Sequence, residues 1–94
     1  MQVIFWPEAE QEALAAQEWY ESCSPGLGYE FARATEVAVG AARRMPLAHP
    51  RIEGEYRHVL LRKFPYSIIF FPSASSILIV SCFHHRRKPL SWLA

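Results

Sequence analysis

The chain of 94 residues has the length of one small domain, because single domains usually run from roughly 50 to 200 residues and two separate cores would not fit. With 51% hydrophobic, 14% aromatic and 20% charged residues, the composition is that of a globular protein and excludes a disordered tail. The formal net charge is only +1, which argues against a strongly basic nucleic-acid-binding module.

The charges are divided unevenly between the two halves of the chain. Residues 1–47 carry three Arg and seven Glu, a net charge of −4, whereas residues 48–94 carry seven Arg or Lys and two Glu, a net charge of +5. Such an asymmetry indicates a polyanionic or acidic partner for the basic half. The alternative is an acidic and a basic face that merely keep the protein soluble.

Chemistry that depends on Asp or on paired cysteines is excluded. The sequence has no Asp or Asn, which removes Asp-based metal loops, Asp-dependent triads and the Asp of a two-metal nuclease. Cys23 and Cys82 stand outside any CxxC or CxxH pattern and are interpreted as structural thiols. We expect no metal and no cofactor. Without an export signal or an apolar run of roughly 20 residues, the expected location is the cytoplasm, with no membrane contact.

In chain order, the first half predicts a short strand and two helices. Residues 1–5 hold Val, Ile and Phe and are typical of a strand that stops before Pro7. Pro7 and three nearby Glu suit the start of a helix, which runs to about Ser22. Beyond a connector with Ser, Pro and Gly, helical spacing of apolar residues predicts a second helix over residues 27–45. The two helices should form an antiparallel hairpin over residues 7–45.

The second half predicts strands. Residues 46–55 hold two prolines and a glycine and are interpreted as a loop. Residues 56–64, 66–71 and 76–83 are rich in β-branched and aromatic residues and predict a three-stranded antiparallel meander over residues 56–83. A basic tail, residues 84–94, follows. The expected fold is one α+β domain, residues 1–94, with the element order β-α-α-β-β-β.

The middle strand of the meander is apolar on both faces. Tyr66, Ile68 and Phe70 alternate with Ile69 and Phe71, and such strands are usually covered on both sides. The helical hairpin can cover one face, and only the tail remains for the other. An uncovered apolar face on a small protein usually marks a partner site. We therefore predict that the chain binds another protein chain across its sheet.

A basic cluster directly follows the last strand, where residues 84–88 read His-His-Arg-Arg-Lys. If the backbone stays extended, His84 and Arg86 share one face of the sheet. A hairpin can bring three further basic residues nearby, namely Arg57, Arg62 and Lys63. Such a group can cut RNA without a metal, because an imidazole or amine moves the 2′-OH proton and guanidinium groups stabilise charge on the phosphate. The alternatives are a solvated strand end and a solubilising tail.

Residues distributed along the chain also have the order and spacing of a known family. The first helix ends in Trp19-Tyr20, Gly28 and Phe31 open the second, and Pro46 closes it. Arg57 and a Phe64-Pro65-Tyr66 entry to the middle strand follow, and the chain ends in His84-x-Arg86-Arg87-x-Pro89-x-x-Trp92. Together these residues resemble the RelE/ParE superfamily of toxins from type II toxin–antitoxin modules.

The resemblance implies a growth-inhibiting toxin that a cognate antitoxin holds inactive in a hetero-oligomeric complex. RelE-like members cleave mRNA at the ribosome, whereas ParE-like members inhibit DNA gyrase without catalytic chemistry of their own. RelE-like members generally use a basic strand cluster with a C-terminal tyrosine or histidine. By position, the residues that would fill these roles are Arg57, Arg62 or Lys63, His84 and Arg86.

The branch is indicated by the C-terminal pattern. No tyrosine follows the last strand, and the Phe-Pro-Tyr entry and the HxRRxPxxW ending are more similar to the ParE-like and plasmid-stabilisation branch. Action on gyrase is therefore marginally favoured over ribosome-dependent mRNA cleavage, and an inactive interaction module is the third hypothesis. The residues expected to contact the antitoxin or the target are Lys63, Arg87, Lys88, Trp92, Ile69 and Phe71.

Overall fold

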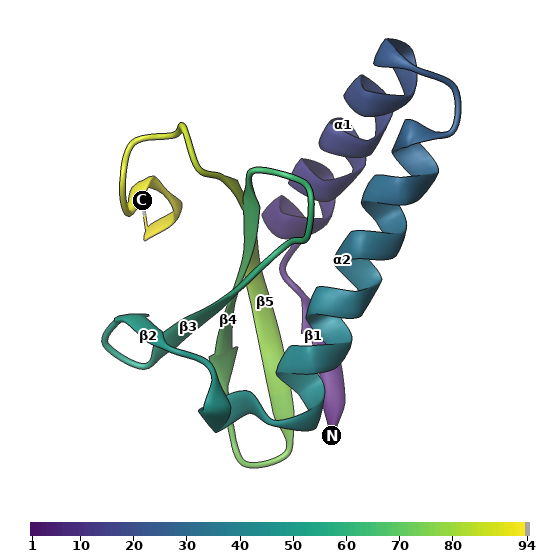
Figure 1. Ribbon diagram of the computed structural model, residues 1–94. Coiled ribbons are helices and arrows are strands. Elements are labelled where there is room, and N and C mark those ends of the chain that lie inside the picture. The colour runs from purple at the N-terminus through teal and green to yellow at the C-terminus, as the bar shows by residue number, and fades with distance from the viewer. Residues whose placement is uncertain (94) are drawn as a thin grey trace.

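The N-terminal half forms one strand and a pair of helices (Figure 1). The computed structural model describes residues 1–93. Strand β1, Gln2–Phe5, leads into helix α1, Pro7–Cys23, and helix α2, Leu27–Arg44, returns beside it. Pro7 occupies the start of α1, where its missing N–H costs no hydrogen bond. The chain reverses at Gly26, whose φ of +90° is accessible to glycine without steric cost.

Gly28 allows the two helices to approach closely where they join. A Cβ atom at this position would lie 2.7 Å from the Gln17 carbonyl oxygen and 2.9 Å from the Glu21 Cβ. The Glu21 carboxylate also accepts hydrogen bonds from the backbone N–H groups of Gly26, at 3.1 Å, and Gly28, at 3.0 Å. The hairpin turn is therefore fixed by a close contact and by a side-chain acceptor.

Gly28→Ala is expected to lower the free energy of unfolding by about 1–3 kcal/mol, because the added methyl group overlaps backbone that cannot move away. Gly40→Ala in the same helix is the matched control, since its Cβ would meet only the Arg44 Nη1 atom, at 3.4 Å. There the substitution should be neutral or stabilising by up to about 1 kcal/mol. Urea midpoints measure both effects, and equal midpoints for the two variants would contradict the account.

Residues 46–93 hold four strands and two short 3-10 turns. The turn Pro46–Ala48 precedes β2, Arg51–Glu53, which is followed by β3, Tyr56–Leu60, β4, Tyr66–Pro72, and β5, Ser76–His84. The second turn, Ser91–Leu93, lies in the tail. The α+β class and the order of the predicted elements are confirmed.

The interpretation of residues 46–55 as a loop was wrong, because they contain β2. Gly54 adopts φ of +53°, so the chain turns back within two residues of Glu53 and Arg51 pairs with Arg57 of β3. A three-residue strand carries too little periodic pattern to be recognised in the sequence.

The strand predicted over residues 56–64 is shorter than expected and ends at Leu60. Lys63 adopts φ of +70°, which is outside the extended region, and Pro65 has no N–H to contribute to a ladder. The chain therefore turns over residues 61–65, and the Leu61 N–H donates to the Tyr66 carbonyl at 2.9 Å.

All five strands form one sheet in the order β1-β5-β4-β3-β2. β1 runs parallel to β5, and the remaining neighbours are antiparallel. The helical hairpin therefore connects β1, at one edge of the sheet, to β2 at the opposite edge. Figure 1 shows both helices on one face, here called the inner face, and the C-terminal tail on the other, the outer face.

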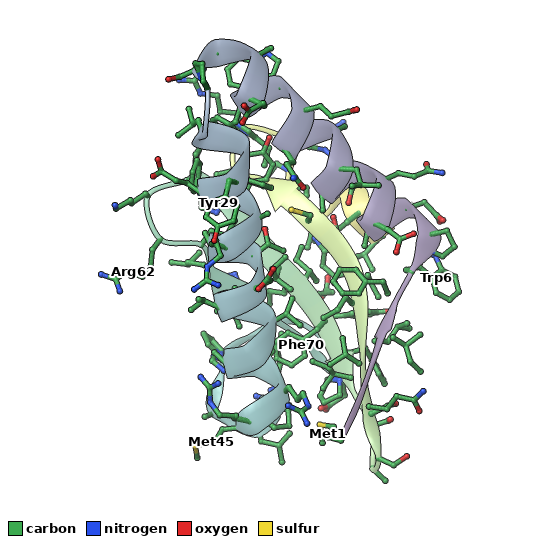
Figure 2. All side chains as sticks on the ribbon, turned by 90° about the vertical axis from the view of Figure 1, so that its right-hand side faces the viewer. Met1, Trp6, Tyr29, Met45, Arg62 and Phe70 are labelled. Carbon is green, nitrogen blue, oxygen red and sulfur yellow. The ribbon has the colours of Figure 1, made fainter. Side chains whose placement is uncertain are left out.

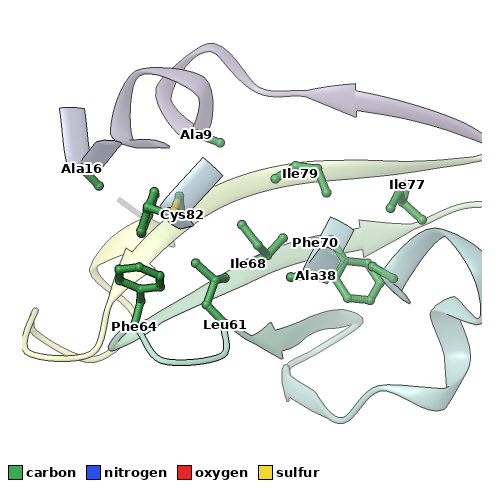
Figure 3. Packing of buried hydrophobic residues seen from close by; sticks show 12 residues of the cluster. Ala9, Ala16, Ala38, Leu61, Phe64, Ile68, Phe70, Ile77, Ile79 and Cys82 are labelled. Carbon is green, nitrogen blue, oxygen red and sulfur yellow. The ribbon is translucent and has the colours of Figure 1, made fainter. Parts of the chain in front are cut away.

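The core lies between the inner face and the helices (Figure 3). Phe70, Ile77 and Ile79 from neighbouring strands are fully buried there. The helices contribute small residues that allow close approach to the sheet, Ala9, Ala16, Ala38 and Ala42, together with Phe31. The Phe31 ring packs edge to face on Phe64 and Tyr66, at centroid distances of 5.1 and 5.0 Å.

The two cysteines lie in different environments. Cys23 is exposed and Cys82 is buried, and both are free thiols. Burial raises the pKa of the Cys82 thiol to about 12, so it stays protonated and packs as a small apolar group of the core. None of the helices described in residues 1–93 is sufficiently long and hydrophobic to span a bilayer.

Candidate functional site

Several basic side chains lie at one end of the sheet. Leu60 pairs with Ser67, and Tyr66 pairs with His84, so the end of β3, the start of β4 and the end of β5 lie at the same end of the sheet. The β3–β4 turn and the tail project from this end of the sheet, and Figure 2 shows Arg62 pointing away from the fold. We call the exposed cations here the basic end: Arg62, Lys63, Arg86 and Lys88.

Arg57 is not brought together with the basic end. It pairs with Phe70 in the ladder and faces the loop that follows α2. Its Nη1 atom donates to the carbonyl oxygens of His49, at 2.7 Å, and Leu47, at 3.4 Å. These bonds fasten the 3-10 turn to the sheet, a structural contact that the sequence did not indicate.

His84 lies on the inner side of the sheet, beside α1. Its ring meets the Tyr66 ring edge to face at 4.8 Å, and its Nδ1 atom accepts the Arg86 N–H at 2.9 Å. The condition of extended backbone beyond His84 is not met, because the Arg87 N–H donates to the His84 carbonyl at 3.0 Å and closes a turn. His84 and Arg86 are thus linked through a local turn rather than through a shared strand face.

Glu12 of α1 holds the end of β5 and the tail in place. Its Oε1 atom accepts the Ser81 hydroxyl, at 2.9 Å, and the Cys82 N–H, at 3.0 Å. Its Oε2 atom pairs with the Arg87 Nη1 atom at 2.6 Å. Since β1 pairs with β5 only as far as Ile79, Glu12 supplies an acceptor for a part of β5 that β1 does not reach.

The tail covers part of the outer face and borders an apolar groove. This outer groove has a volume of about 500 Å³. It runs between β3, β4 and the tail, and its lining residues include Leu60, Ile69, Phe83, Leu90 and Trp92. Leu60 is 59% exposed, whereas Ile69 is only 2% exposed at the floor. The sequence predicted an apolar outer face with the tail as its only cover, and the arrangement agrees with that.

Phe71 and Trp92, two of the residues expected to contact the antitoxin or the target, are joined through Tyr56 in a short row of aromatic rings on the outer face. The Trp92 ring packs edge to face on Tyr56 at 4.9 Å, and Tyr56 packs on Phe71 at 5.2 Å. Phe71 is therefore partly covered, and Trp92 attaches the tail to β3. The Arg87 guanidinium lies 5.1 Å from the centroid of the Phe83 ring, within the range of a cation–π contact.

Sequence reasoning missed two polar side chains of the outer groove, Ser67 and His58, and did not predict the partner of a third, His85. His85 lies across from the buried Ser67, with 2.8 Å between its Nε2 atom and the Ser67 Oγ atom. His58 lines the same groove. Because the hydrogen bond joins residues 18 positions apart, its only signal is the register of β4 with β5, which the sequence does not specify.

The environment of His58 makes stability dependent on pH. Its pKa is lowered, chiefly because the ring is removed from water and also because His85 and His49 lie near. The unfolded chain therefore binds more protons than the folded chain as the pH falls through the ordinary histidine pKa of about 6.5, and the free energy of unfolding decreases. We expect a lower urea midpoint at about pH 5.5 than at about pH 7.5.

His58→Gln should reduce this pH dependence, and His84→Gln is the control, which should retain it. If the urea midpoint fell equally in wild type and His58→Gln between about pH 7.5 and about pH 5.5, another group would be responsible for the pH dependence. The comparison between the variants is needed because the chain has four histidines.

The described part of the chain contains no cluster of side chains that could form a metal site. Among residues 1–93, no three side chains of His, Cys, Asp or Glu gather in a way that could hold an ion. The basic end and the outer groove present imidazole, guanidinium and ammonium groups and an apolar surface.

Comparison with known proteins identifies a shared fold. No family model and no curated protein matches the sequence. Among solved structures, the chain is similar to one from "Chromosomal ParDE TA system from P. aeruginosa", with a TM-score of 0.65. The alignment covers 89% of this chain and 95% of that chain, at 17% sequence identity. The two chains therefore have the same fold, in which a helical hairpin covers one face of an antiparallel sheet that β1 joins in parallel.

Proposed function

We propose that this protein is the toxin of a type II toxin–antitoxin module and that a cognate antitoxin neutralises it. The observation that carries the proposal is the fold shared with a chain of a ParDE system over 89% of the sequence. The resemblance noted in the sequence leads to the same proposal from individual residues. A hetero-oligomeric complex in the cytoplasm follows from it.

The outer groove and the basic end together form the proposed antitoxin surface. An apolar groove beside four exposed cations suits an acidic segment with apolar side chains on one face. Ile69, Phe71 and Trp92 belong to the outer face, and Lys63 and Lys88 stand at the basic end. Arg87 is already paired with Glu12, so in this proposal it positions the tail and offers a partner only its remaining donors.

Inhibition of DNA gyrase by binding is the favoured action. Its support is that the proposed nuclease residues do not all converge: Arg57 bonds to loop carbonyls away from the basic end, and the His84 ring packs against Tyr66 on the inner side. A binder needs an accessible surface rather than converging catalytic groups, and the basic end provides one.

Ribosome-dependent mRNA cleavage is the second candidate. His84 lies beside Arg86 of the basic end, and Arg62 lies at the same end of the sheet. In this alternative His84 is the acid or base, and Arg62 and Arg86 contact phosphate. Arg57 is the third residue assigned to phosphate contact from the sequence. An inactive interaction module is the third candidate.

Replacement of His84 by Ala separates the first two candidates. For a nuclease, loss of the general acid or base should lower mRNA cleavage by about 100-fold or more, whereas a gyrase inhibitor should keep its toxicity. The measurement is mapping of mRNA ends in cells that express each form, together with a DNA-damage reporter. Intact mRNA with a DNA-damage response supports gyrase, and undiminished mRNA cleavage by His84→Ala would contradict the assignment of His84.

A further inference from the structure

A second hollow lies on the outer face, on the opposite side of the tail from the outer groove. This aromatic cavity has a volume of about 370 Å³ and lies between the start of α1, β5 and the tail. Leu78 and Val80 of β5 line it, with Trp6 from one side and Tyr56 and Trp92 from the other. An apolar floor between aromatic walls is typical of small-molecule sites.

The aromatic rings are held by contacts of their own. Trp92 packs on Tyr56 at 4.9 Å, so this wall is a pair of rings rather than a single exposed one. The Trp6 Nε1 atom donates to the Glu8 Oε2 atom at 2.9 Å. The bond that fixes the indole therefore also holds a carboxylate in the lining of the cavity.

The charge of the cavity is negative. Its ionised lining groups are Glu8, Glu12 and Arg87, and the Glu12–Arg87 pair, at 2.6 Å, cancels two of them. Glu8 takes part in neither of the two ion pairs found among residues 1–93. One carboxylate outside these ion pairs and three aromatic rings thus border the same space, and both kinds of group attract a cation.

We propose that the aromatic cavity binds a small organic cation, an ammonium group carried on an apolar stem. The stem packs on Leu78 and Val80, and the cationic head lies between the ring faces and the Glu8 carboxylate. This site adjoins the antitoxin surface of the proposed function, with which it shares Trp92, but it does not depend on that function. Since Glu8 is exposed, the electrostatic part of the affinity is modest and sensitive to salt.

The three tryptophans of the chain provide a test with an internal control. Trp6 and Trp92 line the aromatic cavity, while Trp19 lies on α1 outside it and is 61% exposed. Titration of the full chain with choline, followed through the three indole N–H signals by NMR, should shift Trp6 and Trp92 along one saturable curve and leave Trp19 in place. A neutral isostere, 3,3-dimethylbutan-1-ol, should bind more weakly by about fivefold. Equal shifts of all three signals, or equal binding of the alcohol, would overturn the proposal.

Two substitutions sharpen the result. Glu8→Gln keeps an acceptor for the Trp6 indole but removes the charge, and should weaken choline binding by about threefold. Trp6→Leu removes one wall and should weaken it by about fivefold or more. Glu18→Gln, an exposed change on the same helix, is the control and should bind as wild type. Unchanged affinity in both Glu8→Gln and Trp6→Leu would refute the site.

Discussion

Leu60→Glu is expected to abolish binding of the antitoxin while leaving the chain folded. Leu60 lines the outer groove and is 59% exposed, so a carboxylate there stays solvated in the free protein. In the complex the same carboxylate would be buried against an acidic partner segment. Loss of an apolar anchor combined with charge repulsion should weaken binding by about 100-fold or more.

The measurement is the dissociation constant, by calorimetry, for the protein encoded by the adjacent small reading frame. Leu47→Glu is the matched control, because Leu47 is 70% exposed but lies in the 3-10 turn after α2, away from the groove. It should bind as wild type. If Leu60→Glu bound as tightly as Leu47→Glu, the outer groove would not be the antitoxin surface.

Glu12→Ala is expected to lower the free energy of unfolding by about 2–4 kcal/mol. The substitution removes the acceptor of the buried Ser81 hydroxyl and of the Cys82 N–H, and each unsatisfied buried group costs about 1–3 kcal/mol. It also releases Arg87, whose side chain is 42% exposed and can be solvated, so that loss adds little.

Glu12→Gln distinguishes the hydrogen bonds from the charge. Its amide oxygen still accepts from Ser81 and Cys82, while the pairing with Arg87 is weakened, so the loss of stability should be less than half that of Glu12→Ala. Glu18→Ala, on the exposed side of the same helix, should cost less than about 0.5 kcal/mol. Urea denaturation measures all three, and a similar loss for Glu12→Ala and Glu18→Ala would contradict the role given to Glu12.

The elements with a strong period could be predicted from the sequence. The helical hairpin has apolar residues at helical spacing, and β4 and β5 are runs rich in β-branched and aromatic residues; both predictions were confirmed. The outer face was also anticipated, because Ile69 and Phe71 alternate with the core residues Ile68 and Phe70.

The composition of the site depends on register, and this is why it could not be predicted completely. The hydrogen bond between Ser67 and His85 and the three bonds of Glu12 join residues that are 18 to 75 positions apart. A shift of one residue in strand pairing would move each side chain to the other face. The same uncertainty grouped Arg57 with the basic cluster, although its ladder position places it against the loop after α2.

The net charge of +1 conceals the arrangement that the fold produces. Turn 61–65 and tail residues 86–88 come from different parts of the sequence, but the pairing of β3, β4 and β5 places them at one end of the sheet. The acidic first half forms the helices on the inner face. A weakly charged chain therefore presents a locally basic surface, which suits an acidic protein segment or a nucleic-acid complex.

The central claim, that the chain is a toxin held inactive by a partner, is tested most directly by growth. Cells that express the chain alone are expected to stop growing, and cells that also express the protein from the adjacent small reading frame are expected to grow normally. Co-expression with the Leu60→Glu variant should leave growth arrested, because that variant escapes the antitoxin. Normal growth of cells that contain the folded chain without any partner would contradict the account.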